Sequence, residues 1–192
     1  MSAADDLAAG LRALATALAA WPAKSAIIGG IAVCALGHVR LTKDVDATVD
    51  GTHTEIEPLL QALSQVQIVP RVSDAVAFAR RRYVLLLEHA PTHTPIDVSL
   101  AFVPWEIKAL GQTTSVEFEG VRIRVPTPEN LIIYKLVAFR PKDVEDATVL
   151  AQLHHKDIDF ARVRRVLEEF CAVLEDETRL AMLDRIEAST HL

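Results

Sequence analysis

A short apolar segment that ends in two glycines, with an Asp-x-Asp pair downstream, constrains this chain more than any other sequence feature. Ser25–Ile28 leads into Gly29 and Gly30, and apolar residues from Ile31 to Leu36 follow. This order predicts a buried strand, a tight turn and a helix. Glycines at a strand end let the backbone approach a ligand closely, and the amide groups at a helix start favour phosphate.

The Asp-x-Asp pair predicts a site for a hard cation. Residues 44–49 alternate acidic or small residues with apolar ones, as in a strand with one buried face, so Asp44 and Asp46 are expected to point the same way. Carboxylate oxygens on one face favour Mg²⁺. Asp97, flanked by apolar Ile96 and Val98, would add a third carboxylate from a neighbouring strand and complete a two-metal site. The chemistry of a nucleoside triphosphate (NTP) is expected at such a site.

Hydrophobic periodicity predicts a mixed α/β fold followed by a helical tail. Helices are expected at 5–21, 31–36, 55–65, 75–82 and 105–110, strands at 25–30, 44–49, 67–70, 83–87 and 96–102, and a hairpin at 113–125. From Thr127 onward, every expected element is helical: 128–139, 142–153, 160–174 and 178–188. We therefore expect a core over residues 1–126, with a helical extension over 127–192 packed on it as one compact unit.

Composition excludes several classes of protein. The 192 residues are 51% hydrophobic and 24% charged, which predicts one globular domain. A net charge of −6 argues against constitutive, sequence-independent DNA binding, since that function needs a broad basic surface. The two cysteines are isolated, no apolar run approaches the roughly 20 residues of a membrane span, and Asp5 and Asp6 stand where a signal peptide would be basic. We expect a cytoplasmic protein without membrane contact.

These motifs resemble the signature of the DNA polymerase β-like nucleotidyltransferase superfamily. The stretches that carry the resemblance are Ile28-Gly29-Gly30, Arg40-Leu41-Thr42-Lys43, Asp44-Val45-Asp46 and Ile96-Asp97-Val98. Within the superfamily, Gly-Gly-x-Ala followed by Gly, Arg-x-Thr and Asp-hydrophobic-Asp is most similar to the AbiEii-type transferases, which include toxins of bacterial toxin–antitoxin modules. A later stretch, 128–146, is similar to the second half of that pattern.

The resemblance implies roles for individual residues. Gly29 and Gly30 would cradle the triphosphate, Asp44 and Asp46 would hold two Mg²⁺ ions, and Asp97 would bind metal and act as general base. Nucleotide binding would further involve Lys135, Arg40, Thr42 and Arg140, with Asp143 and Asp146 orienting Lys135 or Arg140. Without the resemblance, Asp143 and Asp146 are ordinary residues of a helix start, and Lys135 could equally extend its amine to the surface.

The implied reaction transfers a nucleoside monophosphate from an NTP to a hydroxyl acceptor and releases pyrophosphate. The AbiEii-like interpretation makes the acceptor a tRNA end or a protein side chain and allows an antitoxin-like partner. Antibiotic nucleotidyltransferases share the Gly-Gly and Asp-x-Asp cluster, so a small-molecule acceptor is an alternative. A non-catalytic nucleotide-binding or partner-binding module on the same fold is a third hypothesis.

Overall fold

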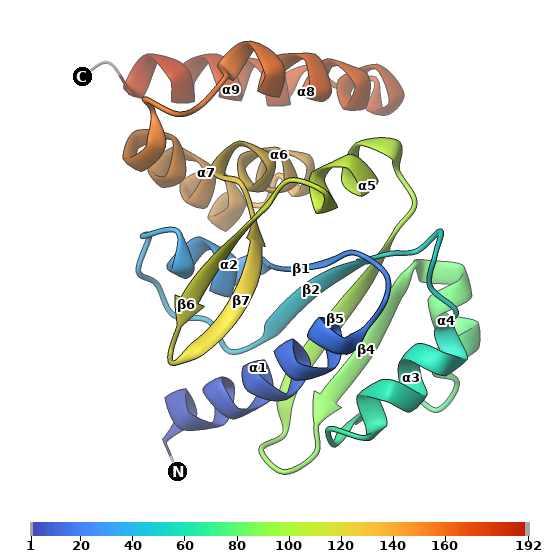
Figure 1. Cartoon of the computed structure of the whole chain (residues 1–192). Helices are drawn as coiled ribbons and strands as arrows, with labels where there is room; N and C mark the ends of the chain where they lie inside the picture. The colour runs from blue at the N-terminus through green and yellow to red at the C-terminus, as the bar shows by residue number, and fades with distance from the viewer. Residues whose placement is uncertain (1, 191–192) are drawn as a thin grey trace.

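A computed structural model describes residues 2–190 of the chain (Figure 1). The first part of the fold consists of α1 (Ala3–Ala20), β1 (Ser25–Ile28), α2 (Gly29–Ala35), β2 (Val45–Asp50), α3 (Ile56–Ser64), β3 (Ile68–Pro70), α4 (Ala75–Arg82), β4 (Val84–His89) and β5 (Thr94–Ala101). The second part consists of α5 (Pro104–Leu110), β6 (Thr113–Phe118), β7 (Val121–Pro126), α6 (Pro128–Ala138), α7 (Pro141–His154), α8 (Phe160–Leu174) and α9 (Thr178–Ser189).

The five strands of the main sheet are arranged in the order β1-β2-β5-β4-β3. β2 and β5 run parallel at its centre, and the other neighbouring strands pair antiparallel. β6 and β7 form a separate two-stranded antiparallel sheet. The expected mixed α/β fold with a helical C-terminal part is confirmed.

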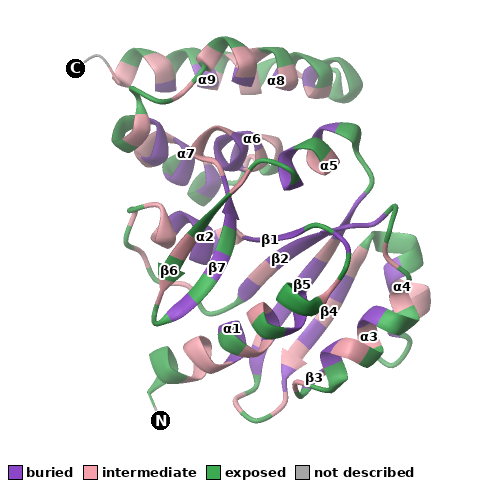
Figure 2. Ribbon diagram, viewed as in Figure 1, coloured by how far each residue is buried: buried purple, intermediate pink, exposed green. Residues whose placement is uncertain are grey.

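Helices lie on both sides of the main sheet. α1 crosses one side, and α6 and α7 lie between the sheet and the outer pair α8 and α9 (Figure 1). One apolar core contains Leu14 of α1, Val98 of β5, Leu131 of α6 and Leu167 of α8. Buried residues concentrate in the strands and in α6 and α7, whereas exposed residues predominate on the outer side of α8 (Figure 2). The C-terminal helices therefore share the core of the sheet.

The structure differs from the sequence expectation at the two segments that matter most for the site. α2 begins at Gly29 and not at Ile31, because Gly29 itself makes the turn with a φ of +65° and Gly30 already belongs to the first helical turn. β2 begins at Val45, so Asp44 immediately precedes the strand. Among residues 2–190, no helix combines the length and the apolar character that a membrane crossing requires.

Candidate active site

The end of β1 and the beginning of β2 meet at Gly29 and Asp46. Ile28 pairs with Asp46 in the ladder, and the chain turns immediately afterwards at Gly29. A Cβ atom added to Gly29 would lie 1.9 Å from Asp46 Oδ2, and one added to Gly30 would lie 2.5 Å from Thr42 Oγ1. Both glycines are therefore required for close packing against the residues that surround the Asp-x-Asp pair.

We expect Gly29→Ala to destabilise the protein by more than the cost of placing an alanine in a left-handed backbone conformation. A left-handed backbone costs alanine about 1–2 kcal/mol, and the new methyl group must also displace the Asp46 carboxylate. Gly120→Ala is the matched control, because Gly120 has a φ of +67° and open space around the added Cβ. We expect urea denaturation to show a larger loss of stability for Gly29→Ala than for Gly120→Ala. Equal losses would contradict the close contact with Asp46.

Two of the three candidate carboxylates, Asp46 and Asp97, lie side by side on the central strands, and Asp44 immediately precedes β2. Asp46 and Asp97 are neighbours in the parallel pairing of β2 with β5, and Thr42 Oγ1 donates a 2.9 Å hydrogen bond to Asp44 Oδ1. Burial, together with the negative charges of Asp44 and Asp97, raises the pKa of Asp46 to about 6. This concentration of negative charge favours a bound cation, and its oxygen donors are those that Mg²⁺ prefers.

Asp97 has a partner that the sequence did not suggest. Its carboxylate forms an ion pair with Arg71 Nη2, and Arg71 Nε donates a 2.7 Å hydrogen bond to the backbone oxygen of Leu87. Burial raises the pKa of Asp97, and the charge of Arg71 opposes that shift. Within residues 2–190, no three carboxylate, imidazole or thiolate side chains are grouped closely enough to hold a metal ion as they stand. In this arrangement Asp97 is paired with a guanidinium group.

Asp46→Asn is expected to stabilise the metal-free protein. The folded-state pKa of about 6 exceeds the ordinary value of 3.8, so the charged carboxylate destabilises the fold above pH 6, and this cost disappears below about pH 4. Because Asp46 is only partly buried, we expect a gain of about 1–2 kcal/mol at pH 8 and little change at pH 4. Urea denaturation in EDTA measures both values. A gain of the same size at both pH values would argue against the electrostatic cause.

A buried ionic cluster lies next to these carboxylates. Lys135 of α6 is only 5% exposed, and its Nζ lies 2.7 Å from Asp146 Oδ2 and 3.3 Å from Asp143 Oδ1. Both aspartates belong to α7 and are themselves buried. The structure therefore brings Lys135 together with Asp143 and Asp146, as the resemblance implied, and encloses its amine within the protein.

Two arginines complete the ionic cluster. Arg40 Nε lies 2.9 Å from Asp146 Oδ1, and Arg40 Nη2 donates to Asp146 Oδ2 at 3.1 Å. Arg140 donates through Nε and Nη2 to Asp143, yet its side chain remains 61% exposed. Asp146 thus ties the loop before β2 to α6, whereas Arg140 stays accessible to a ligand.

Lys142 is a further cation that the sequence analysis left without a role. It is exposed in the first turn of α7, and its positive charge lowers the pKa of Asp46. Only its position next to Asp143 in the motif stretch could have suggested it. For Arg71, the sequence offers no signal beyond its place directly after the β3 strand.

The chain has a nucleotidyltransferase-like fold. A family model described as "Nucleotidyltransferase of unknown function (DUF6036)" matches residues 110–189, which include β6, β7 and the helices α6 to α9. The matched segment contains Lys135, Asp143 and Asp146 and lies outside the strands that carry Asp46 and Asp97. A search of curated proteins found no match.

Three solved structures share the fold across nearly their whole length. The solution structure of the antibiotic-resistance factor ANT(2″)-Ia has a TM-score of 0.59 and 18% identity, and the match covers 91% of this chain and 97% of that one. JHP933 from Helicobacter pylori has a TM-score of 0.55 and 16% identity, with coverage of 98% and 93%. An antigenic nucleotidyltransferase-like protein from Paracoccidioides brasiliensis has a TM-score of 0.54 and 16% identity. The match covers 94% of this chain and 93% of that one. These likenesses establish the fold.

Proposed function

We propose that this protein is a Mg²⁺-dependent nucleotidyltransferase that transfers a nucleoside monophosphate from an NTP to a hydroxyl acceptor. The observation that carries the proposal is the contact between the glycine turn at Gly29 and Asp46, beside the neighbouring Asp97. A glycine turn at a helix start and partly buried carboxylates with excess negative charge together suit an NTP that arrives with metal ions.

Each residue of the site would have its own role in the reaction. Asp44 and Asp46 would hold two Mg²⁺ ions, which supply charge neutralisation and lower the pKa of the attacking hydroxyl. Asp97 would also bind a metal ion, after leaving its ion pair with Arg71, and would accept the proton of the acceptor hydroxyl. The amides of Gly29 and Gly30 would bind the triphosphate, with positive charge from Arg140 and Lys142.

The remaining site residues would hold the metal-binding and nucleotide-binding side chains in place. Thr42 orients Asp44 through its 2.9 Å hydrogen bond, and Asp146 holds Arg40 against α6 and α7. Lys135 contributes positive charge from below the surface, since its charge lowers the pKa of Asp46. The pair Asp143 and Asp146 would keep Lys135 and both arginines at the edge of the nucleotide site.

For the acceptor, we favour a tRNA end or a protein side chain, as in AbiEii-type toxins, in a cytoplasmic protein controlled by an antitoxin-like partner. The basis of this choice is the Arg-x-Thr and Asp-x-Asp pattern quoted above. An antibiotic is the second candidate, because the antibiotic-resistance factor ANT(2″)-Ia shares the fold along 97% of its chain.

Incubation with each α-³²P-labelled NTP tests the proposal. We expect labelling of an acceptor from total tRNA, from a protein extract or from a panel of hydroxyl-bearing antibiotics, with release of pyrophosphate and loss of activity in EDTA. Calorimetry with and without Mg²⁺ accompanies the assay. Tight NTP binding without transfer to any of these acceptors would favour the non-catalytic module and overturn the proposal.

A further inference from the structure

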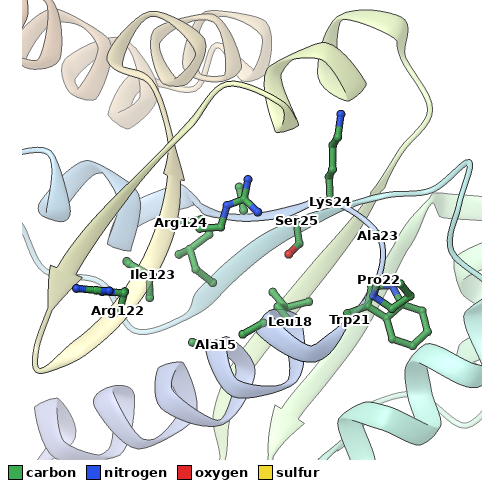
Figure 3. Close-up of a pocket in the computed structure, with 13 residues that line it drawn as sticks. Ala15, Leu18, Trp21, Pro22, Ala23, Lys24, Ser25, Arg122, Ile123 and Arg124 are labelled. Atoms are coloured by element: carbon green, nitrogen blue, oxygen red, sulfur yellow. The ribbon is translucent and has the colours of Figure 1, made fainter.

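A cleft lies between α1, β1 and β7, away from the carboxylates (Figure 3). This β1–β7 cleft has a volume of about 320 Å³. Its lining includes Ala15 and Leu18 from α1, Ser25 and Ile27 from β1, and residues 122–124 from β7. A cavity of this size is at the lower end of those that hold small organic molecules.

The β1–β7 cleft lies on the opposite side of the main sheet from Asp46. Directly paired residues of an antiparallel ladder present their side chains on the same face, so Asp46 shares a face with its partner Ile28. Because side chains alternate along a strand, Ser25 and Ile27 point to the other face, where they line the cleft together with Leu18 of α1. The cleft is therefore distinct from the proposed nucleotide site.

The β1–β7 cleft is positively charged, whereas the whole protein has a net charge of −6. Lys24, Arg122 and Arg124 line the cleft, and none of the described residues that line it is acidic. Within residues 2–190, none of these three cations forms an ion pair. A local excess of positive charge without internal partners favours an anionic ligand.

Arg124 offers free hydrogen-bond donors to the charged group of such a ligand. In Figure 3, its side chain extends from β7 toward β1. Arg124 is exposed, and its Nε and Nη2 donate to Thr113 Oγ1 at 3.0 and 2.8 Å. The other N–H groups of the planar guanidinium remain free, and their fork matches the two oxygens of a carboxylate.

Ser25 supplies a second, independent indication of a ligand. The residue is only 7% exposed and lines the cleft. Within residues 2–190, its hydroxyl has no hydrogen-bond partner. Because buried polar groups are almost always hydrogen-bonded, an acceptor oxygen in the cleft would satisfy this hydroxyl.

Much of the remaining lining of the cleft is apolar. It includes the side chains of Leu18 and Ala15 on α1, Ile27 on β1 and Ile123 on β7. A small inorganic anion would pair with Arg124 but would leave these side chains uncovered. An apolar group next to them gains free energy because it removes apolar surface from water. The lining therefore selects for a ligand that has both an anionic group and an apolar body.

We propose that the β1–β7 cleft binds a small carboxylic acid with an apolar body, in its ionised form. The carboxylate pairs with Arg124 and accepts a hydrogen bond from Ser25 Oγ. The apolar body packs against Leu18, Ile27 and Ile123. A singly charged carboxylate suits this site better than a doubly charged phosphate, because each additional charge next to an apolar wall adds a desolvation penalty.

Isothermal titration calorimetry of the full chain with octanoate tests this proposal. We expect saturable binding with a single site. Octanol has the same apolar chain without the charge, and inorganic phosphate has charge without an apolar chain. We expect each of them to bind at least about tenfold more weakly than octanoate. The titrations contain neither NTP nor Mg²⁺, so their outcome does not depend on the proposed nucleotidyl transfer.

Two variants locate the ligand in the β1–β7 cleft. Arg124→Gln removes the charged partner of the carboxylate, and we expect it to weaken octanoate binding by about tenfold or more. Ala15→Leu should have an effect of at least that size, because its side chain occupies space that the ligand needs. The matched controls are Arg81→Gln, at an exposed arginine of α4, and Ala20→Leu, at an exposed alanine of α1 outside the lining of the cleft. Both controls should bind octanoate like the wild type.

Circular dichroism confirms that each variant is folded. Absence of octanoate binding by the wild type would overturn the proposal. Equal affinity for octanol would show apolar contact without a carboxylate site, and equal affinity for inorganic phosphate would show an anion site that needs no apolar body. Either result would overturn the proposal, and so would control variants that weaken binding as much as Arg124→Gln and Ala15→Leu.

Discussion

Replacing Asp46 or Asp44 with asparagine is expected to lower the rate of nucleotidyl transfer by about 10³-fold or more. Asp44 immediately precedes β2, and Asp46, the second residue of that strand, is partly buried next to Asp97. Asparagine keeps the size of the side chain but removes the charge that would hold Mg²⁺ against the triphosphate. Since phosphoryl transfer depends on positioning and charge neutralisation, losing either carboxylate removes the main source of catalysis.

The assay for this prediction is incorporation of α-³²P-labelled nucleotide under single-turnover conditions. Asp157→Asn serves as the matched control, because Asp157 is exposed in the loop after α7 and contacts none of the site residues. The control should retain wild-type activity. We therefore expect Asp46→Asn to be more stable than the wild type without metal and, at the same time, inactive in nucleotidyl transfer. Wild-type rates in both Asp44→Asn and Asp46→Asn would remove these carboxylates from the mechanism.

Lys135→Met is expected to destabilise the fold by about 3 kcal/mol or more. The methionine would match the length of the lysine stem but would leave Asp143 and Asp146 buried without their shared ammonium partner. Asp146 would keep its ion pair with Arg40, and Asp143 would keep its ion pair with Arg140, so the expected loss lies at the lower end of the range for a broken buried ion pair. Removing an exposed lysine has a far smaller effect.

Urea denaturation at neutral pH measures the loss, with Lys156→Met as the control at an exposed position. The double variant Lys135→Met/Asp146→Asn should be less destabilised than the sum of the single variants, because it removes an unpaired charge together with its former partner. If Lys135→Met costs less than about 1 kcal/mol, the buried cluster does not stabilise the protein in the way the structure indicates.

Most secondary structure could be predicted because the signals are local. The apolar periodicity of α8, the cap at Thr127 with Pro128 behind it, and the alternation around Asp46 each depend on neighbours within a few residues. The adjacency of Asp97 to Asp46 was also predicted, from the apolar flanks of Asp97 and the family resemblance. α2 begins at Gly29 and β5 at Thr94, each two residues before the predicted start. Backbone φ at Gly29 and the pairing of β5 with β4 decide these boundaries, and composition does not.

The ion pairs could not be predicted because their partners are far apart along the chain. Arg71 and Asp97 are separated by 26 residues, and Arg40 and Asp146 by 106. Arg71 does not differ in its sequence surroundings from an arginine that faces solvent, and the Arg-x-Thr motif around Arg40 predicts nucleotide binding and not a pairing with Asp146. Their partners follow from the packing of β3 beside β4 and of the loop before β2 against α7.

By itself, the sequence determined the order of strand, glycine turn, helix and Asp-x-Asp strand, because steric freedom at glycine and two-residue alternation are properties of the local chain. Only the tertiary structure decided that Lys135 is enclosed between Asp143 and Asp146 and that Asp97 faces Arg71. Those outcomes depend on how distant elements pack, since burial and proximity set the energy of each charge.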